Sequence, residues 1–385
     1  MKAARIHSFG PPDVVVVEDV PLPAPGPGEV LVRVMAAGVA PWDATIREGK
    51  SKVSPQPPLT LGSDFSGVVD KVGPGVTDFA PADEVYGVTN PQFCGAQAEF
   101  AVATADMVAR KPQSLNHVEA ASAPVIAVTA WQMLFQYAQA VRGQTVMVVG
   151  AAGNVGAYAV QMAVDAGIHV VAIAHLDDEA LLRSLGVKSI IDSSKPAFEK
   201  DLPPVDAILD TVGGSTFQLC VAALKPGGKL VTSVSTQPQP AGAVFFYVEV
   251  ATARLQTITA LFDADKLTAR VGSVLPLSEA RRAQQMLAGA THKPGKIVLE
   301  IGHPQLSRSA SLYTSARARC TRWIEIAPSP TADATRFTFP ERMSPTAKTA
   351  GRLVSSICGG RSRGHFRGAS ARTGSRSRPV RMKPC

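Results

Sequence analysis

The clearest candidate for chemistry is a group of glycines near the middle of the chain, in the segment Gly150-Ala151-Ala152-Gly153-Asn154-Val155-Gly156. A predicted strand, residues 145–149, precedes it, and a predicted helix, residues 155–166, begins at its end. A turn between them needs glycines because the backbone turns tightly and because a pyrophosphate approaches only where no Cβ blocks it. The free N–H groups and the dipole at the helix start favour phosphate charge. A purely structural turn is the alternative, but the flanking elements favour a bound dinucleotide, contacted by Gly150, Gly153, Asn154, Val155 and Gly156.

The end of the next predicted strand selects between two dinucleotides. An acidic residue about 20 positions after the glycines would bind the ribose 2′-hydroxyl and favour NAD. That position falls at residues 174–176, which contain no carboxylate, so we expect NADP with His175 as a contact. Asp177 and Asp178 follow directly and would repel a 2′-phosphate, and the first cation after them is Arg183. NAD therefore stays open as the second choice.

Two kinds of sequence pattern surround the glycine segment and predict an α/β protein. Residues 1–125 contain short β-favouring runs between Gly- and Pro-rich turns, as at 29–34 and 67–73, which is typical of a barrel-like β domain. Residues 126–270 alternate apolar strands with helices, which predicts a doubly wound parallel sheet. Residues 271–303 carry a predicted helix and strand that we expect to complete the first domain. The expected strands of the sheet are 145–149, 169–174, 189–192, 207–212 and 229–234, and its expected helices are 155–166 and 177–185.

Five further segments accompany the glycines: residues 38–43 (GVAPWD), 61–67 (LGSDFSG), 128–132 (VTAWQ), 224–228 (LKPGG) and 295–299 (GKIVL). Together they resemble the medium-chain dehydrogenase/reductase superfamily, on its zinc-independent quinone oxidoreductase and enoyl reductase branch. The resemblance covers residues 1–303. It implies a GroES-like β domain and a Rossmann domain with the active site in the cleft between them. It also implies hydride transfer from NAD(P)H to a quinone, an enone or a related carbonyl compound, and it suggests a homodimer.

The resemblance identifies the positions at which zinc ligands would stand, and we expect neither a catalytic nor a structural zinc. Zinc members of the superfamily carry Cys at the position of Ala40 and Gly-His-Glu at residues 62–64. Ala40 has no ligand atom, and the hydroxyl of Ser63 is a poor zinc ligand. No lobe with four cysteines is present, and Cys94 is better explained as a small packed residue.

Without zinc, the substrate carbonyl must be polarised in another way. Members of this branch often carry Asn at position 40, which this chain replaces by Ala40. Asp43 and Thr45 are the nearest candidates for a catalytic role. Asp43 is equally well explained as a structural cap, and water remains open as the proton donor.

Further cofactor contacts follow from the resemblance and from strand ends. Thr129 stands where the family approaches the nicotinamide, with a hydroxyl that caps a helix as the alternative. Thr211 and Gly213 end one predicted strand, and Ser233 and Ser235 end the next, at the edge where open α/β sheets bind ligands. We also expect a cofactor contact from the late family lysine, Lys296, with a solvated lysine as the alternative. An aromatic run, residues 245–247, either walls the nicotinamide pocket or packs in the core.

Charge divides the chain into two parts. Of 39 basic and 31 acidic residues, 16 and 3 lie in residues 304–385, which leaves 23 and 28 in residues 1–303. The net charge is therefore +13 in the tail and −5 in the body. The tail combines 14 Arg and 12 Ser with few apolar residues, so we expect it to be disordered, either as an unstructured extension or as translation in a shifted reading frame. Salt-dependent nucleic-acid binding by the tail is an alternative, and none is expected for residues 1–303.

The composition excludes some classes of protein. With 45% hydrophobic and 18% charged residues, the chain has enough apolar material for a core. It has no apolar run near the roughly 20 residues of a membrane helix and no recognisable leader, and Cys94 and Cys220 are the only cysteines before residue 304, so we expect a cytoplasmic protein. An NADPH-dependent reductase is the favoured interpretation, and a cofactor-binding protein with little catalysis is the alternative.

Overall fold

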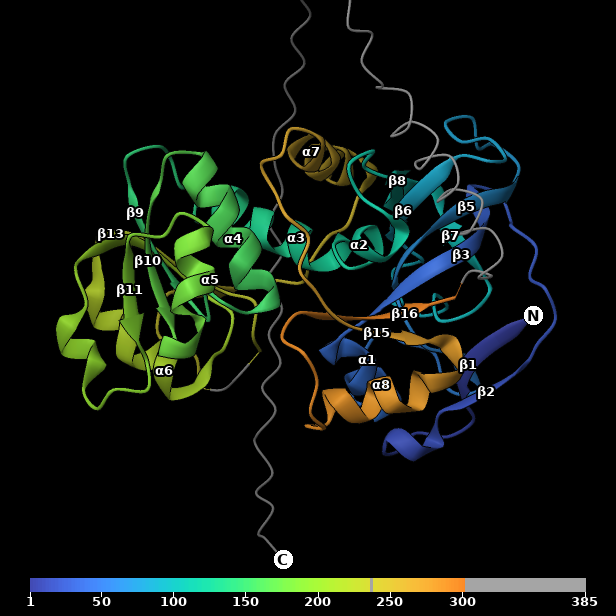
Figure 1. Ribbon diagram of the computed structural model, residues 1–385, viewed down its shortest axis with the longest axis horizontal. Coiled ribbons are helices and arrows are strands. Elements are labelled where there is room, and N and C mark those ends of the chain that lie inside the picture. The colour runs from blue at the N-terminus through green and yellow to red at the C-terminus, as the bar shows by residue number, and fades with distance from the viewer. Residues whose placement is uncertain (236–237, 302–385) are drawn as a thin grey trace, which may run out of the picture. The chain divides into compact units, whose positions relative to one another are not determined.

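The computed structural model describes residues 1–235 and 238–301 (Figure 1). The predictions of disorder and of nucleic-acid binding for residues 304–385 lie outside the described residues. Two lobes, each built on its own large sheet, make up the described part. The predicted α/β class, with a β-rich first part and a parallel sheet after it, is confirmed.

The first lobe is built on a seven-stranded sheet with the order β15–β16–β3–β5–β6–β8, in which β7 also pairs with β3. Alternate residues of β3, such as Val30, Val32 and Val34, are buried in one apolar cluster with Phe65 of β5. A smaller sheet has the order β2–β1–β4. The strands before the second lobe are β1 (Lys2–Ile6), β2 (Val16–Asp19), β3 (Glu29–Val39), β4 (Leu59–Thr60), β5 (Asp64–Val72), β6 (Glu84–Val88), β7 (Phe100–Thr104) and β8 (Val108–Arg110).

The chain returns to this sheet after the second lobe. Strand β16 (Lys296–Glu300) pairs antiparallel with β3, and β15 (Val271–Pro276) lies parallel to β16 on its other side. Between them lies α8 (Ala280–Leu287), whose Ala280 and Ala283 are buried in the same cluster as Leu299. Lys296 therefore enters the first lobe beside α1 (Pro41–Arg47), which directly follows β3.

The second lobe contains six parallel strands in the order β11–β10–β9–β12–β13–β14. Their apolar runs are continuous because the sheet is covered on both faces, and residues 146–149 are fully buried. From β9 the chain adds β10 and β11 on one side, and it then crosses over to add β12, β13 and β14 on the other side. Ligands bind outside the strand ends at such a reversal of strand order. The elements are β9 (Thr145–Val149), β10 (His169–Ala174), β11 (Ser189–Asp192), β12 (Val205–Asp210), β13 (Leu224–Thr232), β14 (Ala243–Phe245), α4 (Asn154–Asp165), α5 (Glu179–Ser184) and α6 (Gly214–Cys220).

Two predicted strands of the parallel sheet have different bounds in the structure. β12 ends at Asp210 rather than at residue 212, because the Asp210 carboxylate accepts hydrogen bonds from the N–H groups of Val212 at 3.0 Å and Gly213 at 2.8 Å. These bonds turn the chain away from the sheet. β13 begins at Leu224 rather than at residue 229, since Leu224 already pairs with Val205.

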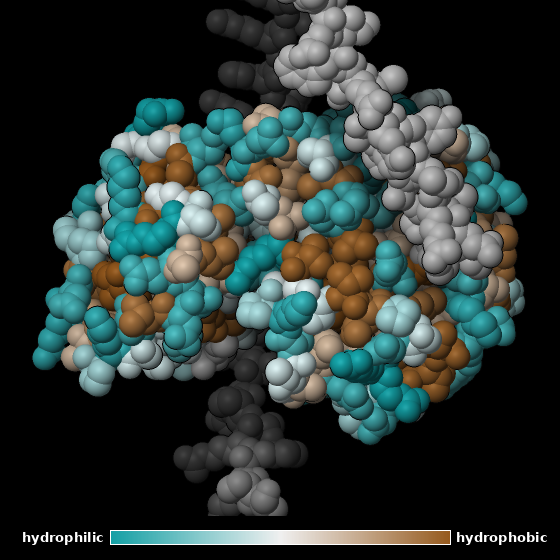
Figure 2. Space-filling model, viewed as in Figure 1, coloured by the Kyte–Doolittle hydropathy of each residue, from teal (hydrophilic) through white to brown (hydrophobic). Residues whose placement is uncertain are grey.

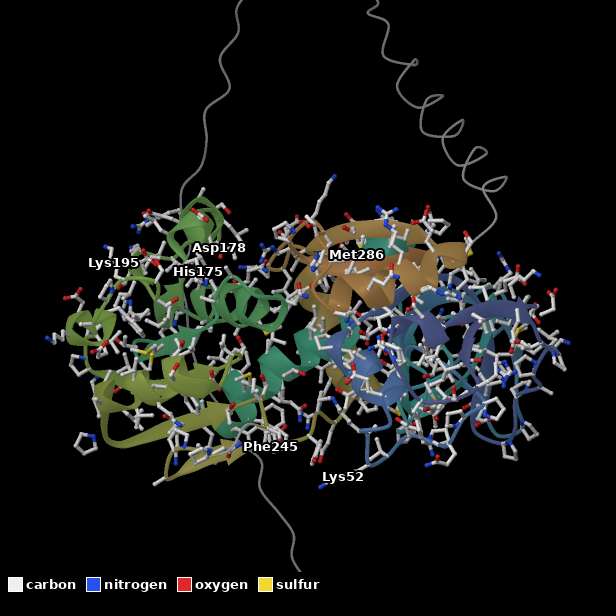
Figure 3. The ribbon with its side chains drawn as sticks, turned by 90° about the horizontal axis from the view of Figure 1, so that it is seen from below. Lys52, His175, Asp178, Lys195, Phe245 and Met286 are labelled. Atoms are coloured by element: carbon white, nitrogen blue, oxygen red, sulfur yellow. The ribbon has the colours of Figure 1, made fainter. Side chains whose placement is uncertain are left out.

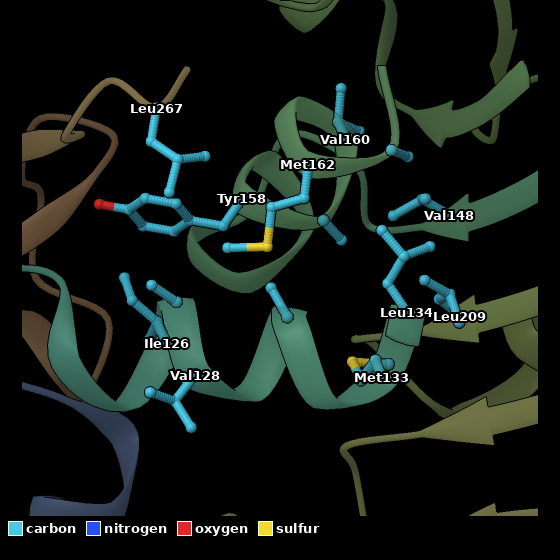
Figure 4. Close-up of a cluster of buried hydrophobic side chains, with 14 of the residues drawn as sticks. Ile126, Val128, Met133, Leu134, Val148, Tyr158, Val160, Met162, Leu209 and Leu267 are labelled. Carbon is cyan, nitrogen blue, oxygen red and sulfur yellow. The ribbon is translucent and has the colours of Figure 1, made fainter. Parts of the chain in front are cut away.

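Four helices lie between the sheets: α2 (His117–Ala121), α3 (Pro124–Trp131), the π-helical segment Gln132–Tyr137 that continues α3, and α7 (Thr252–Asp263). Figure 4 shows α3 and its continuation packed against α4, with Ile126 facing Tyr158 and with Leu134 beside Val148. Full burial of each such side chain contributes about 1.5–3 kcal/mol. This packing fixes α3 and its continuation against α4 and β9.

The surface of the described residues is mixed in character. The face in Figure 2 shows hydrophilic and hydrophobic residues interspersed over both lobes. Within residues 1–235 and 238–301, no helix is both long and apolar enough to cross a membrane.

Candidate functional site

A cavity of about 470 Å³ lies at the carboxyl ends of the parallel strands, which is where open sheets of this topology bind ligands. It has two ends. We call them the Asp178 end, formed by His175, Asp178 and Ser193, and the Lys296 end, formed by Pro41, Trp42 and Lys296. The glycine turn lines the cavity as well. The full lining is Pro41, Trp42, Ile126, Gly150, Ala152, Gly153, Asn154, Val155, Ile173, Ala174, His175, Asp178, Ser193, Thr211, Val212, Thr216 and Lys296.

The glycine turn has the geometry that a phosphate-binding turn requires. Gly150 has φ +79°, and a Cβ on it would stand 2.5 Å from the Thr211 hydroxyl. A Cβ on Gly156 would stand 2.1 Å from the carbonyl oxygen of Gly150, so only glycine lets α4 approach the turn this closely. Gly153 caps α4 without a side-chain acceptor, which leaves the first N–H groups of the helix for an external acceptor. These residues fit a dinucleotide pyrophosphate.

Charged and polar side chains gather at the Asp178 end. Figure 3 shows His175, Asp178 and Lys195 on the same part of the second lobe. Hydrogen bonds from Ser194 lower the pKa of the Asp192 carboxyl, and the charges of Lys195 and His175 lower it further. His175 and Lys195 are exposed, so they meet a ligand without first losing buried contacts.

A cation from a distant part of the chain completes the Asp178 end. Arg270, which directly precedes β15, donates a hydrogen bond from its guanidinium to the carbonyl oxygen of Ala152 in the glycine turn. Partial burial lowers the pKa of Arg270, and the negative charge of Asp178 acts in the opposite direction. The Arg270 guanidinium is thus bonded to the glycine turn and lies near enough to Asp178 for the two charges to interact.

The Lys296 end is built on a buried ion pair. The Lys296 ammonium lies 2.7 Å from Oδ2 of Asp64, and the two side chains are 1% and 0% exposed. It also lies 4.5 Å from the centroid of the Trp42 ring, whose Nε1 donates to the Ser63 hydroxyl at 2.9 Å. Oδ1 of Asp64 accepts from the Val125 N–H at 3.2 Å. Burial raises the pKa of Asp64, and the Lys296 charge counteracts this increase.

The positions that hold zinc in other members contain different chemistry here. Ala40 is buried and has no ligand atom, and the Ser63 hydroxyl accepts the Trp42 hydrogen bond. Within the described residues, no group of three or more His, Cys, Asp and Glu side chains could hold a metal ion.

Comparison with known proteins gives two family matches and close structural relatives. Residues 26–113 match the alcohol dehydrogenase GroES-like domain, and residues 185–299 match the zinc-binding dehydrogenase domain. The quinone oxidoreductase of Coxiella burnetii is 31% identical and has a TM-score of 0.71, with 78% of this chain and 99% of that chain covered. The chain belongs to the medium-chain dehydrogenase/reductase superfamily, in its quinone oxidoreductase-like branch.

Other relatives of this superfamily member match over shorter stretches. The human mitochondrial NAD(P)H oxidoreductase RTN4IP1 is 39% identical over 211 residues, which is 49% of this chain and 53% of that protein. The 2-methylene-furan-3-one reductase of Solanum lycopersicum is 35% identical over 251 residues, which is 62% of this chain and 64% of that protein. The match to the human protein thus spans about half of that protein's length.

The structure brings about half of the predicted site residues into the cavity. Gly150, Gly153, Asn154, Val155, His175, Thr211 and Lys296 line it. Lys296 is buried, so the alternative of a solvated lysine is wrong. The predicted contacts that do not line the cavity are Gly156, Thr129, Gly213, Ser233 and Ser235.

The predicted contacts outside the cavity have other partners. The Thr129 hydroxyl donates to the Val125 carbonyl oxygen at 2.7 Å, within its own helix. The Gly213 N–H is held by Asp210, and the Ser233 hydroxyl donates to the Asp210 carbonyl oxygen at 3.4 Å. The aromatic run at residues 245–247 does not behave as one unit, since Phe246 is buried and Tyr247 is 74% exposed. No residue of that run lines the cavity.

The two predicted catalytic residues also lie outside the cavity lining. Asp43 is fully buried, and its Oδ2 accepts from the Ala40 N–H at 2.9 Å and from Nε2 of Gln97 at 3.3 Å. It therefore has the capping role that the sequence left open. Thr45 is exposed and donates to the Pro41 carbonyl oxygen at 3.3 Å, so it bonds the first turn of α1 rather than facing the cavity.

Sequence reasoning missed several lining residues, namely Pro41, Trp42, Ile126, Ala152, Ile173, Ala174, Ser193, Val212 and Thr216, and it missed Arg270 next to the lining. Pro41 and Trp42 lie in a segment that carries the family resemblance, so their position could have been found there. Ser193 follows β11, and the rule for parallel strand ends could have indicated it. No local signal marks Arg270, which comes from the connection between the lobes.

Proposed function

We propose that this chain is an NADPH-dependent reductase that transfers hydride to a quinone, an enone or a related carbonyl compound without zinc. The observation that carries the proposal is the single cavity that joins the glycine turn to the Lys296 end. When bound, the nicotinamide supplies the hydride. The chain's residues supply position: the turn and the start of α4 hold phosphate, and Pro41, Trp42 and Ile126 enclose the reacting end.

Three features support NADPH over NADH. The end of β10 carries no carboxylate that could bind a ribose 2′-hydroxyl. Arg270 lies at the Asp178 end and offsets the negative charge that the sequence places there. Ser193 lines this end, and Lys195 follows it closely. Cationic and hydroxyl groups are the usual partners of a phosphate.

The residue chemistry at the expected metal positions supports a zinc-independent reaction. Zinc in this superfamily needs Cys, His or carboxylate ligands in a tight tetrahedron. Ala40 offers no donor atom, the Ser63 hydroxyl is occupied by Trp42, and Asp64 is paired with an ammonium. One of the matching domains is described as zinc-binding, but the residues of this chain at these positions do not supply zinc ligands.

The test is turnover by the purified full chain with NADPH or NADH and a panel containing 1,4-benzoquinone and simple enones. We expect NADPH oxidation that exceeds NADH oxidation and that persists after treatment with a chelator. Binding of NADPH without turnover on any acceptor would instead support the second candidate, a cofactor-binding protein with little catalysis. That candidate is favoured by one observation, the placement of Asp43 and Thr45 outside the cavity. Stoichiometric zinc that is lost together with activity would contradict the zinc-independent reaction.

A homodimer and a cytoplasmic location complete the proposal. Strand β14 lies at the edge of the second sheet, and edge strands pair readily with another chain. Val244 in this strand is 44% exposed and Tyr247 beyond it is 74% exposed, which supports a surface between two copies. Sedimentation of the full chain tests the dimer, and a monomer at micromolar concentration would contradict it. Cell fractionation tests the location.

A further inference from the structure

Reduction of an enone creates negative charge on oxygen, and some group must stabilise it. Addition of hydride to the β-carbon forms a C–H bond and breaks the C=C π bond. That electron pair forms a new π bond between the α-carbon and the carbonyl carbon, and the carbonyl π pair moves onto the oxygen. The oxygen becomes an enolate oxyanion until a proton from water reaches the α-carbon. In a zinc-dependent member the metal would meet this charge. The question for this chain is which side chain takes that place.

The Lys296 end contains a cation in a suitable position. Among the described residues that line the cavity, Lys296 carries the one ammonium group. Its ammonium has three donor hydrogens, and one polar partner, Asp64, accepts from it in the described structure. The group is 1% exposed and still belongs to the cavity lining, so a substrate oxygen there would meet a cation that water hardly screens.

The surroundings hold this cation in place before any ligand arrives. Asp64 anchors the ammonium from β5 and is itself held by the Val125 N–H. The Trp42 ring covers one side of the ammonium at 4.5 Å from the ring centroid. A Cβ on Gly38 would lie 2.9 Å from Cβ of Asp64 and 3.0 Å from Cε of Lys296, so glycine at this position makes room for the pair. A charge fixed in this way needs little reorganisation during the reaction.

We propose that Lys296 is a catalytic residue whose ammonium stabilises the oxyanion that develops on the substrate carbonyl. Lys296 keeps its proton throughout and forms no covalent bond with the substrate. Asp64 and Trp42 act as positioning residues, because they contact the ammonium rather than the substrate. This inference rests on the proposed function, and the experiments below separate the two.

The first experiment measures steady-state kinetics of Lys296→Met with NADPH and a simple enone. Loss of one preorganised donor to an oxyanion typically lowers kcat by about 10²–10³. We expect a decrease of that size in kcat, with a much smaller change in the dissociation constant for NADPH. Lys293→Met is the matched control, since Lys293 is exposed and lies three positions before Lys296, and it should leave kcat unchanged. Lys296→Arg should recover part of the lost kcat.

The second experiment does not depend on turnover. With NADP⁺ present, 4-nitrophenol is titrated into each protein, and its visible absorbance reports how much of the bound probe is phenolate. Its oxygen resembles the enolate oxyanion, so wild type should favour bound phenolate and Lys296→Met should not. If Lys296→Met does not fold because Asp64 is left unpaired, the charge-neutral variant Asp64→Asn/Lys296→Met takes its place in both experiments.

The outcomes distinguish the two proposals. A wild type that reduces no acceptor contradicts the proposed function, and the phenolate titration then decides the role of Lys296 alone. A wild type that is active, together with a folded Lys296→Met variant of equal kcat, overturns the inference about Lys296. Equal phenolate binding by wild type and variant overturns it as well.

Discussion

The two ends of the cavity hold charge in opposite ways. At the Asp178 end, His175 and Lys195 are exposed and Arg270 is half-buried. At the Lys296 end, the ammonium and the Asp64 carboxylate are 1% and 0% exposed and contact each other directly. Interactions between exposed charges are screened by water and contribute little free energy, whereas burying a charge is costly unless the charge is paired. We therefore expect changes at the Asp178 end to alter cofactor selectivity in small steps, and changes at the Lys296 end to affect both chemistry and stability.

The largest expected effect concerns the buried network beneath the Lys296 end. Burial raises the pKa of Asp43 to about 7, from 3.8 for an ordinary Asp. Between these values the folded protein keeps a proton that the unfolded chain has released, so the free energy of unfolding falls as pH rises. Asp43→Asn does not ionise and should escape this loss. The free energy of unfolding of wild type, relative to that of the variant, should decrease by a few kcal/mol between about pH 4 and pH 7.

Urea unfolding of both proteins across that pH range measures the difference. Asp83→Asn is the control, because its carboxyl is only partly buried and hydrogen bonding from Arg110 lowers its pKa. The pH dependence at Asp83 therefore has the opposite sign. Its contribution to the free energy of unfolding is lost as pH falls through the lowered pKa. A constant difference between wild type and Asp43→Asn at all pH values would mean that Asp43 titrates as an exposed carboxyl.

The next effect tests the backbone part of the cavity, which the two ends share. In Gly153→Val, a branched side chain would stand where the pyrophosphate approaches, while φ of −71° at this position allows any residue. We expect NADPH affinity to fall about a hundredfold, or ~2.7 kcal/mol, with the melting temperature nearly unchanged. Gly153→Ala is the graded control, since its Cβ would meet only the Gly150 carbonyl oxygen, at 3.1 Å. Unchanged NADPH titration of a folded Gly153→Val variant would remove the turn from the cofactor site.

A smaller effect is expected at the Asp178 end from Arg270→Leu. A hydrogen bond to a charged group contributes about 1.5–3 kcal/mol, and partial exposure puts Arg270 at the low end of that range. NADPH affinity should fall about tenfold while NADH affinity stays constant. Equal losses for both cofactors would place the guanidinium on the pyrophosphate rather than on the 2′-phosphate. Arg282→Leu, on an exposed side chain of α8, should change neither affinity.

The smallest effect is expected from Asp178→Asn, which removes a negative charge near the proposed 2′-phosphate. Since Asp178 is only half-buried, we expect the ratio of NADPH to NADH affinity to rise about two- to threefold, and less at high salt. Asp177→Asn is the matched control, because Asp177 is exposed and does not line the cavity. If Asp177→Asn moves the ratio more than Asp178→Asn does, the ribose lies on the other side of this turn.

Local sequence determined the parts of this protein that depend on local backbone geometry. The bounds of β9 and β10 agree with the prediction, since a buried parallel strand appears as an uninterrupted apolar run. The position of the glycine turn was predicted, and four of its five predicted contacts line the cavity, because tight turning and close approach are demands on a few consecutive residues. The bounds of β12 were less predictable, since they depend on how the Asp210 side chain folds back on the next turn.

Only the tertiary structure decided which charges meet in the cavity. Sequence order left Asp177 and Asp178 without a compensating cation before Arg183, whereas the fold brings Arg270 to that place from the connection between the lobes. Lys296 and Asp64 are 232 positions apart, and β16 pairs them by returning to β3. The physical reason is the range of the forces involved. Backbone conformation is set by neighbours along the chain, but burial and ion pairing depend on neighbours in space, which exist only once both sheets have formed.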